Sequence, residues 1–422
     1  MRAIRPVATL ALILLAACQR QPAGTQSAPA PAAAPTSAPA AWSLEIAPVP
    51  SPAGPDSLAA QFTTSSRGAI LSWLERQGKA TTLTFAERTP SGWTAPTKVQ
   101  SGTNWFVSNA DVPSVFRAAD GTLVANWLPE TDATIEAYNL LLSYSRDNGK
   151  TWARPFSPHH DKTTTQHGFA SFFDLAGGGV GLVWLDGRAQ ELDTTSPEGG
   201  AMSLRSATFD ANWKQTSEEG VDLRVCECCP TTTTVTADGP LAAYRDRSDT
   251  DVRDIRVARL ENGKWVAGPL IHEDGWTLAA CPVNGPSLSA RGRDVAVAWY
   301  TATENQGHAY AAFSTDSGRT WGTPIRLDDA NALGHVDVEL LEDGSAVASW
   351  VEFANQRTEF KVRRVEAGGA TSPAISVAVR PVGVPRIARV GDELLFAWAE
   401  GNAETPQIKT AAARVPRATA VR

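Results

Sequence analysis

Four cysteines gather in two short segments of the chain, and their spacing suits sulfur chemistry. The first segment reads Cys226-Glu-Cys228-Cys229, and the second begins at Cys281. Three kinds of site use cysteines in such a pattern: disulfide bonds, a soft metal such as copper or zinc held by thiolates, or a redox site. Disulfides are the default outside the cytoplasm, and there Cys281 could pair with only one of the other three. Apart from such a metal, nothing in the sequence requires a cofactor.

A second group of residues could bind an anion. Arg188, Arg245 and Arg253 follow or lie close to apolar segments, and each has an acidic neighbour. A guanidinium group binds a carboxylate or sulfate in a fork, so several arginines on one face would suit an acidic ligand. The alternative is that the arginines pair with the neighbouring aspartates, such as Asp186, and only bridge adjacent loops.

The segments that carry these residues belong to a repeat. A phrase of alternating apolar residues that ends in an aromatic one recurs seven times, with 48 to 60 residues between successive aromatics. The aromatics are Trp73, Trp127, Trp184, Tyr244, Trp299, Trp350 and Trp398. Alternation with period two predicts β-strands, and the turns and apolar segments around each phrase indicate four strands per repeat. Repeats of this length with four strands are typical of propeller blades.

We therefore predict an all-β fold, a β-propeller of four-stranded blades. Seven repeats are counted, and six blades are the alternative. The last repeat lacks a fourth strand, and residues 42–49 resemble the fourth strands of other repeats, so this N-terminal segment is predicted to complete the last blade and close the ring. The loops after each aromatic and the links between blades share one face, which gathers the cysteines and arginines there.

Two turns carry the most specific motif in the chain. Residues 145–152 and 314–321 both read S-x-D-x-G-x-x-W. They resemble the Asp-boxes, or BNR repeats, of the sialidase superfamily, in which the Asp and Gly form a tight turn and the Trp packs between sheets. The resemblance covers the region 42–422 and implies a sialidase-like β-propeller. An Asp-box is a feature of the fold rather than of catalysis.

The resemblance also implies roles for the charged residues. Sialidases hold a sugar carboxylate with three arginines and use a tyrosine nucleophile assisted by acidic groups. The resemblance thus implies that Arg188, Arg245 and Arg253 bind substrate, and that Tyr300 is catalytic together with Glu304 and Asp186. The Cys-x-Cys-Cys segment is not part of the sialidase pattern. Three functions follow: hydrolysis of glycans of the exo-sialidase type, a non-catalytic glycan- or protein-binding propeller, or a metal-binding or redox lipoprotein.

The N-terminus resembles a bacterial lipoprotein signal. Two arginines precede an apolar stretch that is too short to span a bilayer and ends in Leu-Ala-Ala-Cys18. This implies that residues 1–17 are a signal peptide, that Cys18 carries lipid, and that residues 18–41 are an Ala/Pro-rich linker. Gln19 follows the cysteine, which in that family favours the outer membrane. We expect an outer-membrane lipoprotein that faces the periplasm or the cell surface.

Charge narrows the choice of partners. The chain has 45 acidic and 38 basic residues, and loss of the signal would remove two of the basic ones and leave a net charge of −9. An acidic surface argues against nucleic acid and anionic lipid as partners. We expect a monomer that binds an acidic glycan or another anionic small ligand and meets the membrane only through its lipid anchor.

Overall fold

Strands dominate the part of the chain that begins at Trp42. The computed structural model describes residues 42–132, 136–190, 200–402 and 404–415, and the predicted signal, Cys18 and linker lie outside them. Within the described residues, helix is limited to two short 3-10 turns, η1 (Arg188–Gln190) and η2 (Thr303–Asn305). None of the helices in these ranges is long and apolar enough to cross a membrane.

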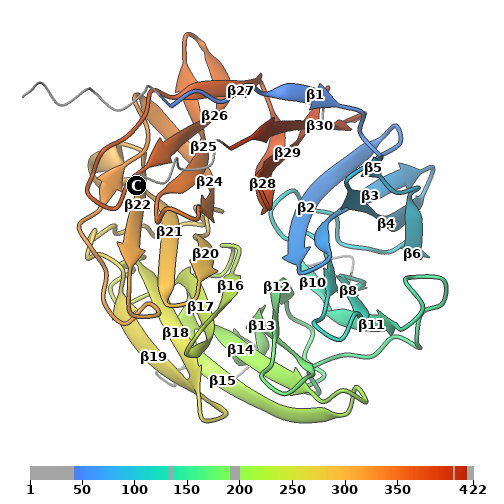
Figure 1. The fold of residues 1–422 in the computed structure, drawn as a ribbon. Coiled ribbons are helices and arrows are strands. Elements are labelled where there is room, and N and C mark those ends of the chain that lie inside the picture. Colours follow the sequence, from blue (N-terminus) through green and yellow to red (C-terminus); the bar gives the residue numbers. More distant parts are fainter. Residues whose placement is uncertain (1–41, 133–135, 191–199, 403, 416–422) are drawn as a thin grey trace, which may run out of the picture. The chain divides into compact units, whose positions relative to one another are not determined.

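Seven antiparallel sheets stand around a central axis as the blades of a propeller (Figure 1). Blades one to three consist of β2 (Ser57–Ser65), β3 (Gly68–Gln77), β4 (Ala80–Thr89), β5 (Gly92–Trp93) and β6 (Thr97–Gly102); β7 (Val115–Arg117), β8 (Leu123–Trp127) and β11 (Leu141–Ser145); and β12 (His167–Asp174), β13 (Val180–Asp186), β14 (Met202–Phe209) and β15 (Gln215–Val225). Blades four and five consist of β16 (Thr232–Thr236), β17 (Gly239–Arg245), β18 (Ile255–Glu261) and β19 (Lys264–Leu270); and β20 (Ser287–Arg291), β21 (Asp294–Thr301), β22 (His308–Ser314) and β23 (Ile325–Arg326). Blades six and seven consist of β24 (Asn331–Leu340), β25 (Ala346–Ala354), β26 (Arg357–Val365) and β27 (Ile375–Val379); and β28 (Val382–Val390), β29 (Glu393–Glu400), β30 (Gln407–Arg414) and β1 (Ala47–Val49).

Blade two departs from the common pattern. Its sheet has three strands, and the place of a fourth is taken by a single bridge between Leu142 and Phe156. A separate two-stranded pair, β9 (Glu130–Asp132) and β10 (Ala137–Tyr138), extends the loop after its aromatic residue. The other blades have four strands or more, so the prediction of four-stranded blades is confirmed and the count is seven rather than six.

The N-terminal strand closes the ring as predicted. β1 pairs antiparallel with β30, with Ala47 opposite Ala412. The strand is shorter than the predicted segment 42–49, yet Trp42 and Ile46 still pack against the core of the last two blades. β1 is the outer strand of blade seven, so it completes the four-stranded sheet and covers part of the edge that β30 would otherwise expose to other chains.

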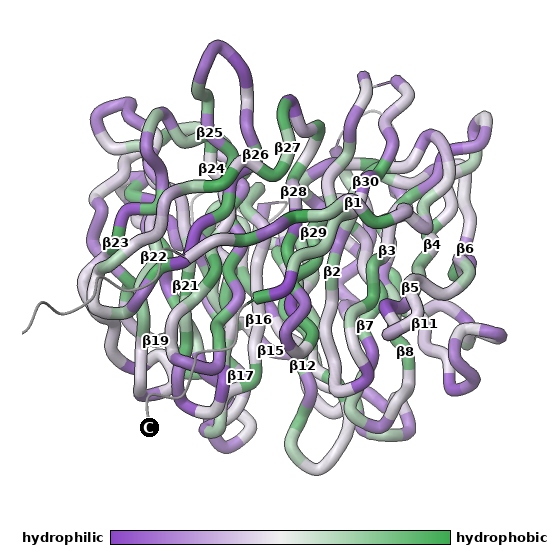
Figure 2. Tube along the Cα trace, turned by 45° about the horizontal axis from the view of Figure 1, so that its top comes forward, coloured by the Kyte–Doolittle hydropathy of each residue, from purple (hydrophilic) through white to green (hydrophobic). Residues whose placement is uncertain are grey.

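The repeated aromatics form the core between neighbouring blades. Trp73, Trp184 and Trp350 have no exposed surface. Each of them donates its indole N–H to an acidic side chain two residues later, at 2.7 to 2.8 Å, and Trp398 does the same with Glu400. Figure 2 shows hydrophobic residues along the strands and hydrophilic ones in the loops at both ends. Burial of large rings between sheets is the main force that holds the blades together.

The two S-x-D-x-G-x-x-W segments form the same turn in blades two and five. Asp147 accepts hydrogen bonds from the Ser145 hydroxyl and from the Thr151 backbone and side chain, at 2.7 to 2.9 Å. In blade five, Asp316 makes the equivalent bonds. The following Trp321 packs against the core shared by blades four and five. The aspartate therefore organises the turn, and the tryptophan fastens it to the preceding blade.

Candidate functional site

The first strand of each blade supplies one equivalent residue to a ring around the axis. It pairs with the residue of the second strand that comes just before the repeated aromatic. Arg386, for example, pairs with Ala397, which precedes Trp398. The seven members, one from each blade in order, are Gln61, Ser114, Ser171, Thr232, Ser287, Asp337 and Arg386. All members of this axial ring are polar, and the charged ones belong to blades six and seven.

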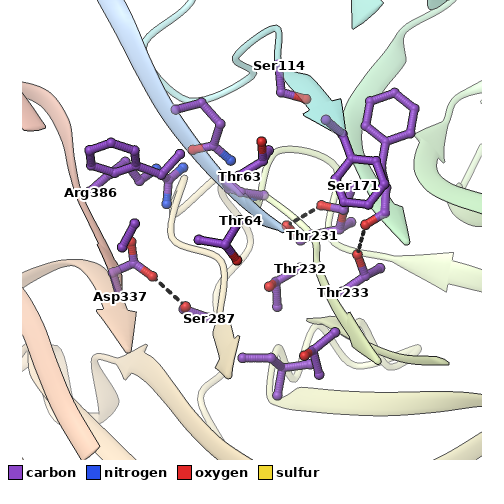
Figure 3. Close-up of a pocket in the computed structure, with 18 of the residues that line it drawn as sticks. Thr63, Thr64, Ser114, Ser171, Thr231, Thr232, Thr233, Ser287, Asp337 and Arg386 are labelled. Carbon is purple, nitrogen blue, oxygen red and sulfur yellow. Dashed lines mark hydrogen bonds between the residues drawn. The ribbon is translucent and has the colours of Figure 1, made fainter. Parts of the chain in front are cut away.

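The axial ring lines a cavity at the centre of the propeller. The cavity has a volume of about 340 Å³ and is bounded by residues from all seven first strands. Figure 3 shows the hydroxyl groups of its wall, which include those of Thr63, Ser171 and Thr233. Asp337 and Arg386 lie near each other on the left of this view. A second hollow of about 390 Å³ shares Ala110 with it and is lined by the segment 108–110, by Val283 and by residues of blades six and seven. A space of this size and polarity suits one sugar unit.

Arg386 stands out because no protein group among the described residues accepts a hydrogen bond from it. Its Nε atom is closed off from solvent and has no hydrogen-bond partner, and within the described residues its guanidinium makes no ion pair. The neighbouring carboxylate of Asp337 is instead engaged by the Ser287 hydroxyl at 2.6 Å and the Ile387 amide at 3.0 Å. Because a partly buried guanidinium without protein partners can still bind a group in the cavity, this arrangement is suited to an anionic ligand.

Burial shifts the pKa of the other titratable groups near the cavity toward their neutral forms. Burial, with repulsion from Asp337, raises the pKa of Glu339 to about 8, so this carboxyl is largely protonated at pH 7. Burial also raises the pKa of Asp337, against the attraction of Arg386. The pKa of His335 is lowered to about 4 by burial and by the charge of Arg386, so the imidazole is neutral. The cavity thus holds a positive charge that is only partly balanced.

Arg245, which the sequence suggests as a substrate ligand, is instead tied to backbone carbonyls. Its guanidinium is 2 % exposed and donates to the carbonyls of Asn284, Arg253 and Tyr300 at 2.6 to 3.0 Å. Its Cζ atom lies 4.9 Å from the ring centre of Trp276. With its donors occupied in this way, Arg245 holds the link before blade five in place.

Arg253 and Arg188 also find partners within the protein. Arg253 donates to the Leu278 carbonyl at 2.7 Å, to Glu227 at 2.8 Å and to the sulfur of Cys226 at 3.1 Å. Arg188 lies in a separate cluster, where it pairs with Asp186 at 2.7 Å and with Glu218 at 2.8 Å. None of the three predicted arginines lines the central cavity. The sequence could not show that each of them has its own partners within the protein.

The predicted catalytic residues lie apart from the cavity and from one another. Asp186 accepts a hydrogen bond from the Trp184 indole N–H at 2.8 Å. The equivalent position in three other blades is a glutamate that accepts from its own tryptophan. Tyr300 is half-buried and meets Trp276 edge to face, and burial raises its pKa. Glu304 is exposed in η2. Among the described residues, no hydrogen bond or ion pair joins any two of the three.

The four cysteines lie together where two links meet. The sulfurs of Cys226, Cys228 and Cys229 lie within 4.8 Å of one another, and the Cys226 and Cys229 sulfurs are 3.4 Å apart. Hydrogen bonds from the Cys228 and Cys229 thiols hold the pKa of Cys226 well below its usual range. Cys281 contacts Cys228 and is exposed, whereas Cys226 and Cys229 are buried. All four are free thiols in this structure.

A second cluster joins His159, Asp161 and His167 near Asp186 and Arg188. The two imidazole rings stack at 3.9 Å with an angle of 1° between their planes. Burial lowers the pKa of His159, while hydrogen bonds from both histidines hold the pKa of Asp161 far below its usual range against the effect of burial. Since parallel rings direct their lone pairs side by side and not toward one point, the cluster is better suited to a buried charge network than to a metal.

Sequence reasoning missed Arg386 because it lies in a strand and not in a loop. Aligning the seven repeats on their aromatic residues, with a one-residue shift allowed in the preceding turn, would have placed Arg386 and Asp337 at the position that is Gln, Ser or Thr in the other five. The same alignment would have shown that Asp186 belongs to a repeated Trp-x-acid pattern. The signal was therefore present, but in the comparison between repeats and not in any single loop.

Solved structures show a similar fold. The polysaccharide lyase Uly1 has a TM-score of 0.51 at 11% identity, over 85% of this chain and 90% of that one. The GH93 alpha-L-arabinofuranosidase of Fusarium graminearum has a TM-score of 0.48 at 11% identity, over 85% of this chain and 93% of that one. Trypanosoma rangeli sialidase has a TM-score of 0.45 at 11% identity, over 84% and 59%. No protein-family model and no curated protein sequence matches this chain.

At such low identity the likeness concerns the fold alone. The chain is a seven-bladed β-propeller, and its axis holds a polar cavity with one unsatisfied guanidinium.

Proposed function

We propose that the protein binds the terminal unit of an acidic glycan in the central cavity, with Arg386 holding its carboxylate or sulfate. The observation that carries this proposal is the Arg386 guanidinium, which faces a cavity and has no hydrogen bond or ion pair among the described residues. An anionic group would supply the missing acceptors in a bidentate fork. The sugar hydroxyls would meet the serine and threonine side chains of the wall.

The charges of the cavity favour an anion over a neutral sugar. The protonated state of Glu339 at pH 7 removes one source of repulsion, since its pKa is raised to about 8. The carboxylate of Asp337 is already held by Ser287 and by the backbone of β28. It therefore attracts Arg386 through its charge but occupies none of the guanidinium donors.

Binding calorimetry with matched arginine variants tests this proposal. The ligands are sialic acid, glucuronic acid, a sulfated monosaccharide and neutral glucose. An anionic sugar should bind to the wild type, and Arg386→Gln should weaken it by about 1.5–3 kcal/mol, the range for hydrogen bonds to a charged group. Arg389→Gln is the control, because Arg389 lies on the same strand but bonds to Leu340 and Glu342 outside the cavity. Equal loss in both variants, or no binding of any anionic sugar, would contradict the proposal.

Hydrolysis of the exo-sialidase type is a second candidate, and one observation favours it. Glu339 is a protonated carboxyl in the cavity and could act as a general acid at neutral pH. Tyr300, the nucleophile that the sialidase resemblance implies, does not line the cavity. Release of an aryl group from acidic glycosides by the wild type, with loss in Glu339→Gln, would establish hydrolysis. Binding without turnover would leave the protein a glycan-binding module.

The N-terminal sequence supports a proposal on location. A cleaved signal ahead of Cys18, with lipid on that cysteine, would tether the propeller through the linker of residues 18–41. Gln19 after the cysteine favours the outer membrane. A propeller at the end of an extended, proline-rich tether could meet glycans in the periplasm or at the cell surface.

A further inference from the structure

The cysteine cluster lies outside the cavity, and the proposed glycan binding makes no use of it. Its sulfurs come from two links, the segment before β16 and the segment before β20, which belong to adjacent blades. Cys226, Cys228 and Cys229 form a tight turn in the first link, and Cys281 reaches Cys228 from the second. The cluster therefore depends on contacts that bring these two links together.

Several contacts hold the two links against each other. A Cβ atom on Gly285 would lie 1.9 Å from the Pro230 carbonyl oxygen, so the two backbones approach more closely than any other residue would allow. Asn284, next to this glycine, accepts Arg245 through its carbonyl and the His335 amide through its side chain. These contacts hold the segments 226–230 and 281–286 together. The sulfurs of the two links are thereby brought close to one another.

The charges around the sulfurs suit a group of thiolates. Arg253 donates to the Cys226 sulfur at 3.1 Å and to the Leu278 carbonyl in the second link. Glu227, within the turn, is bonded by Arg247 and Arg253 and is not free to act as a ligand. Hydrogen bonds from an arginine to a sulfur ligand stabilise its negative charge and fix its position.

We propose that Cys226, Cys228 and Cys229 bind one copper(I) ion, with Cys281 at the open side of the site. Bonds of about 2.3 Å from sulfur to a metal place the sulfurs of a trigonal or tetrahedral site about 3.8–4.0 Å apart. The three sulfurs here lie within 4.8 Å of one another, and the two buried ones at 3.4 Å. Small adjustments of side-chain torsions therefore bring them to the distances of a metal site.

The number of sulfurs distinguishes copper(I) from zinc. Structural zinc sites take four ligands in a tetrahedron, whereas copper(I) is a soft ion that thiolates select. Three sulfurs converge in the described structure, and Cys281 contacts Cys228 without joining that group. Since Cys281 is exposed and lies outside the group of three, it marks the side on which an ion could enter or leave.

Copper(I) titration of the full chain tests the site. The reduced protein is titrated without oxygen against a chelator that competes for copper(I), and the same protein is titrated with zinc. We expect one equivalent of copper(I) to be held with a thiolate charge-transfer band. Cys226→Ser and Cys229→Ser should each weaken copper binding at least 100-fold, and Cys18→Ser, which removes a cysteine outside the propeller, should leave it unchanged.

A second measurement does not depend on the variants. X-ray absorption at the copper edge of the loaded wild type should show three sulfur neighbours at about 2.3 Å. Nitrogen or oxygen neighbours alone, copper that the chelator removes completely, or preference for zinc would overturn the proposal. So would disulfide-bonded cysteines in envelope protein whose thiols are trapped during isolation. Glycan binding is measured without metal, so the failure of one proposal leaves the other standing.

Discussion

Replacing Arg245 by alanine separates a structural arginine from a ligand-binding one. In the wild type this guanidinium donates four hydrogen bonds to the carbonyls of Asn284, Arg253 and Tyr300. It is 2 % exposed and stacks on Trp276 at 4.9 Å. Alanine would leave three buried carbonyl groups without this donor and would remove the contact with the ring.

The expected loss follows from these contacts. A buried acceptor left without its donor costs about 1 kcal/mol or more, and a desolvated cation–π contact contributes about 1 kcal/mol. Three acceptors and one ring give about 4 kcal/mol in the free energy of unfolding. A water molecule that enters the gap would reduce this value by satisfying part of the carbonyl groups.

Equilibrium unfolding in urea measures this loss, and calorimetry with an anionic sugar at a temperature where both proteins are folded measures binding. We expect a lower midpoint with an unchanged slope, and unchanged affinity. Arg245→Lys is the control, because lysine keeps the charge but cannot reach three carbonyls at once. If Arg245→Ala kept its free energy of unfolding but lost affinity for the anionic sugar, this reasoning would be refuted. Arg245 would then be a ligand-binding arginine, as the sequence suggests.

Other predictions concern the fold, the location and the cavity. Trp321→Ala should lower the free energy of unfolding by about 3 kcal/mol, and Asp147→Ala should lower it by loosening its turn, while both leave sugar affinity unchanged in calorimetry; a selective loss of affinity would contradict their place in the fold. Cys18→Ala should release the protein into the soluble envelope fraction, and partition into detergent like the wild type would disprove lipid attachment. Anion affinity should fall as the pH rises through about 8, because Glu339 then ionises and repels the ligand; a flat profile between pH 6 and pH 9 in Glu339→Gln is the control. The raised pKa of Glu339 also means that its contribution to stability is greatest below the ordinary pKa of a carboxyl and is lost as the pH rises toward 8.

The fold could be predicted from the sequence because it depends on short-range patterns that recur. Alternation of apolar residues and the regular aromatic positions predicted the blades, and the N-terminal segment was recognised as the missing fourth strand. Blade two is less regular, since its fourth strand is reduced to one bridge at Phe156. That detail depends on how a long segment packs, which local patterns do not encode.

The site was less accessible to sequence reasoning because partners of charged groups come from distant segments. Arg245 finds its acceptors 8, 39 and 55 residues away along the chain. Arg386 was missed for the opposite reason, since its importance lies in having no such partner. The meeting of the two cysteine links followed from the order of the blades, but the number of sulfurs that converge depends on side-chain positions.

The most direct test of the proposed function is a crystal structure of the propeller with an anionic monosaccharide bound. We predict that the carboxylate or sulfate lies against the guanidinium of Arg386, within the cavity lined by the first strands, and that the hydroxyls of Ser171 and Thr232 face the sugar ring. A sugar bound on the outer surface of the blades, or one whose anionic group points away from Arg386, would contradict the account.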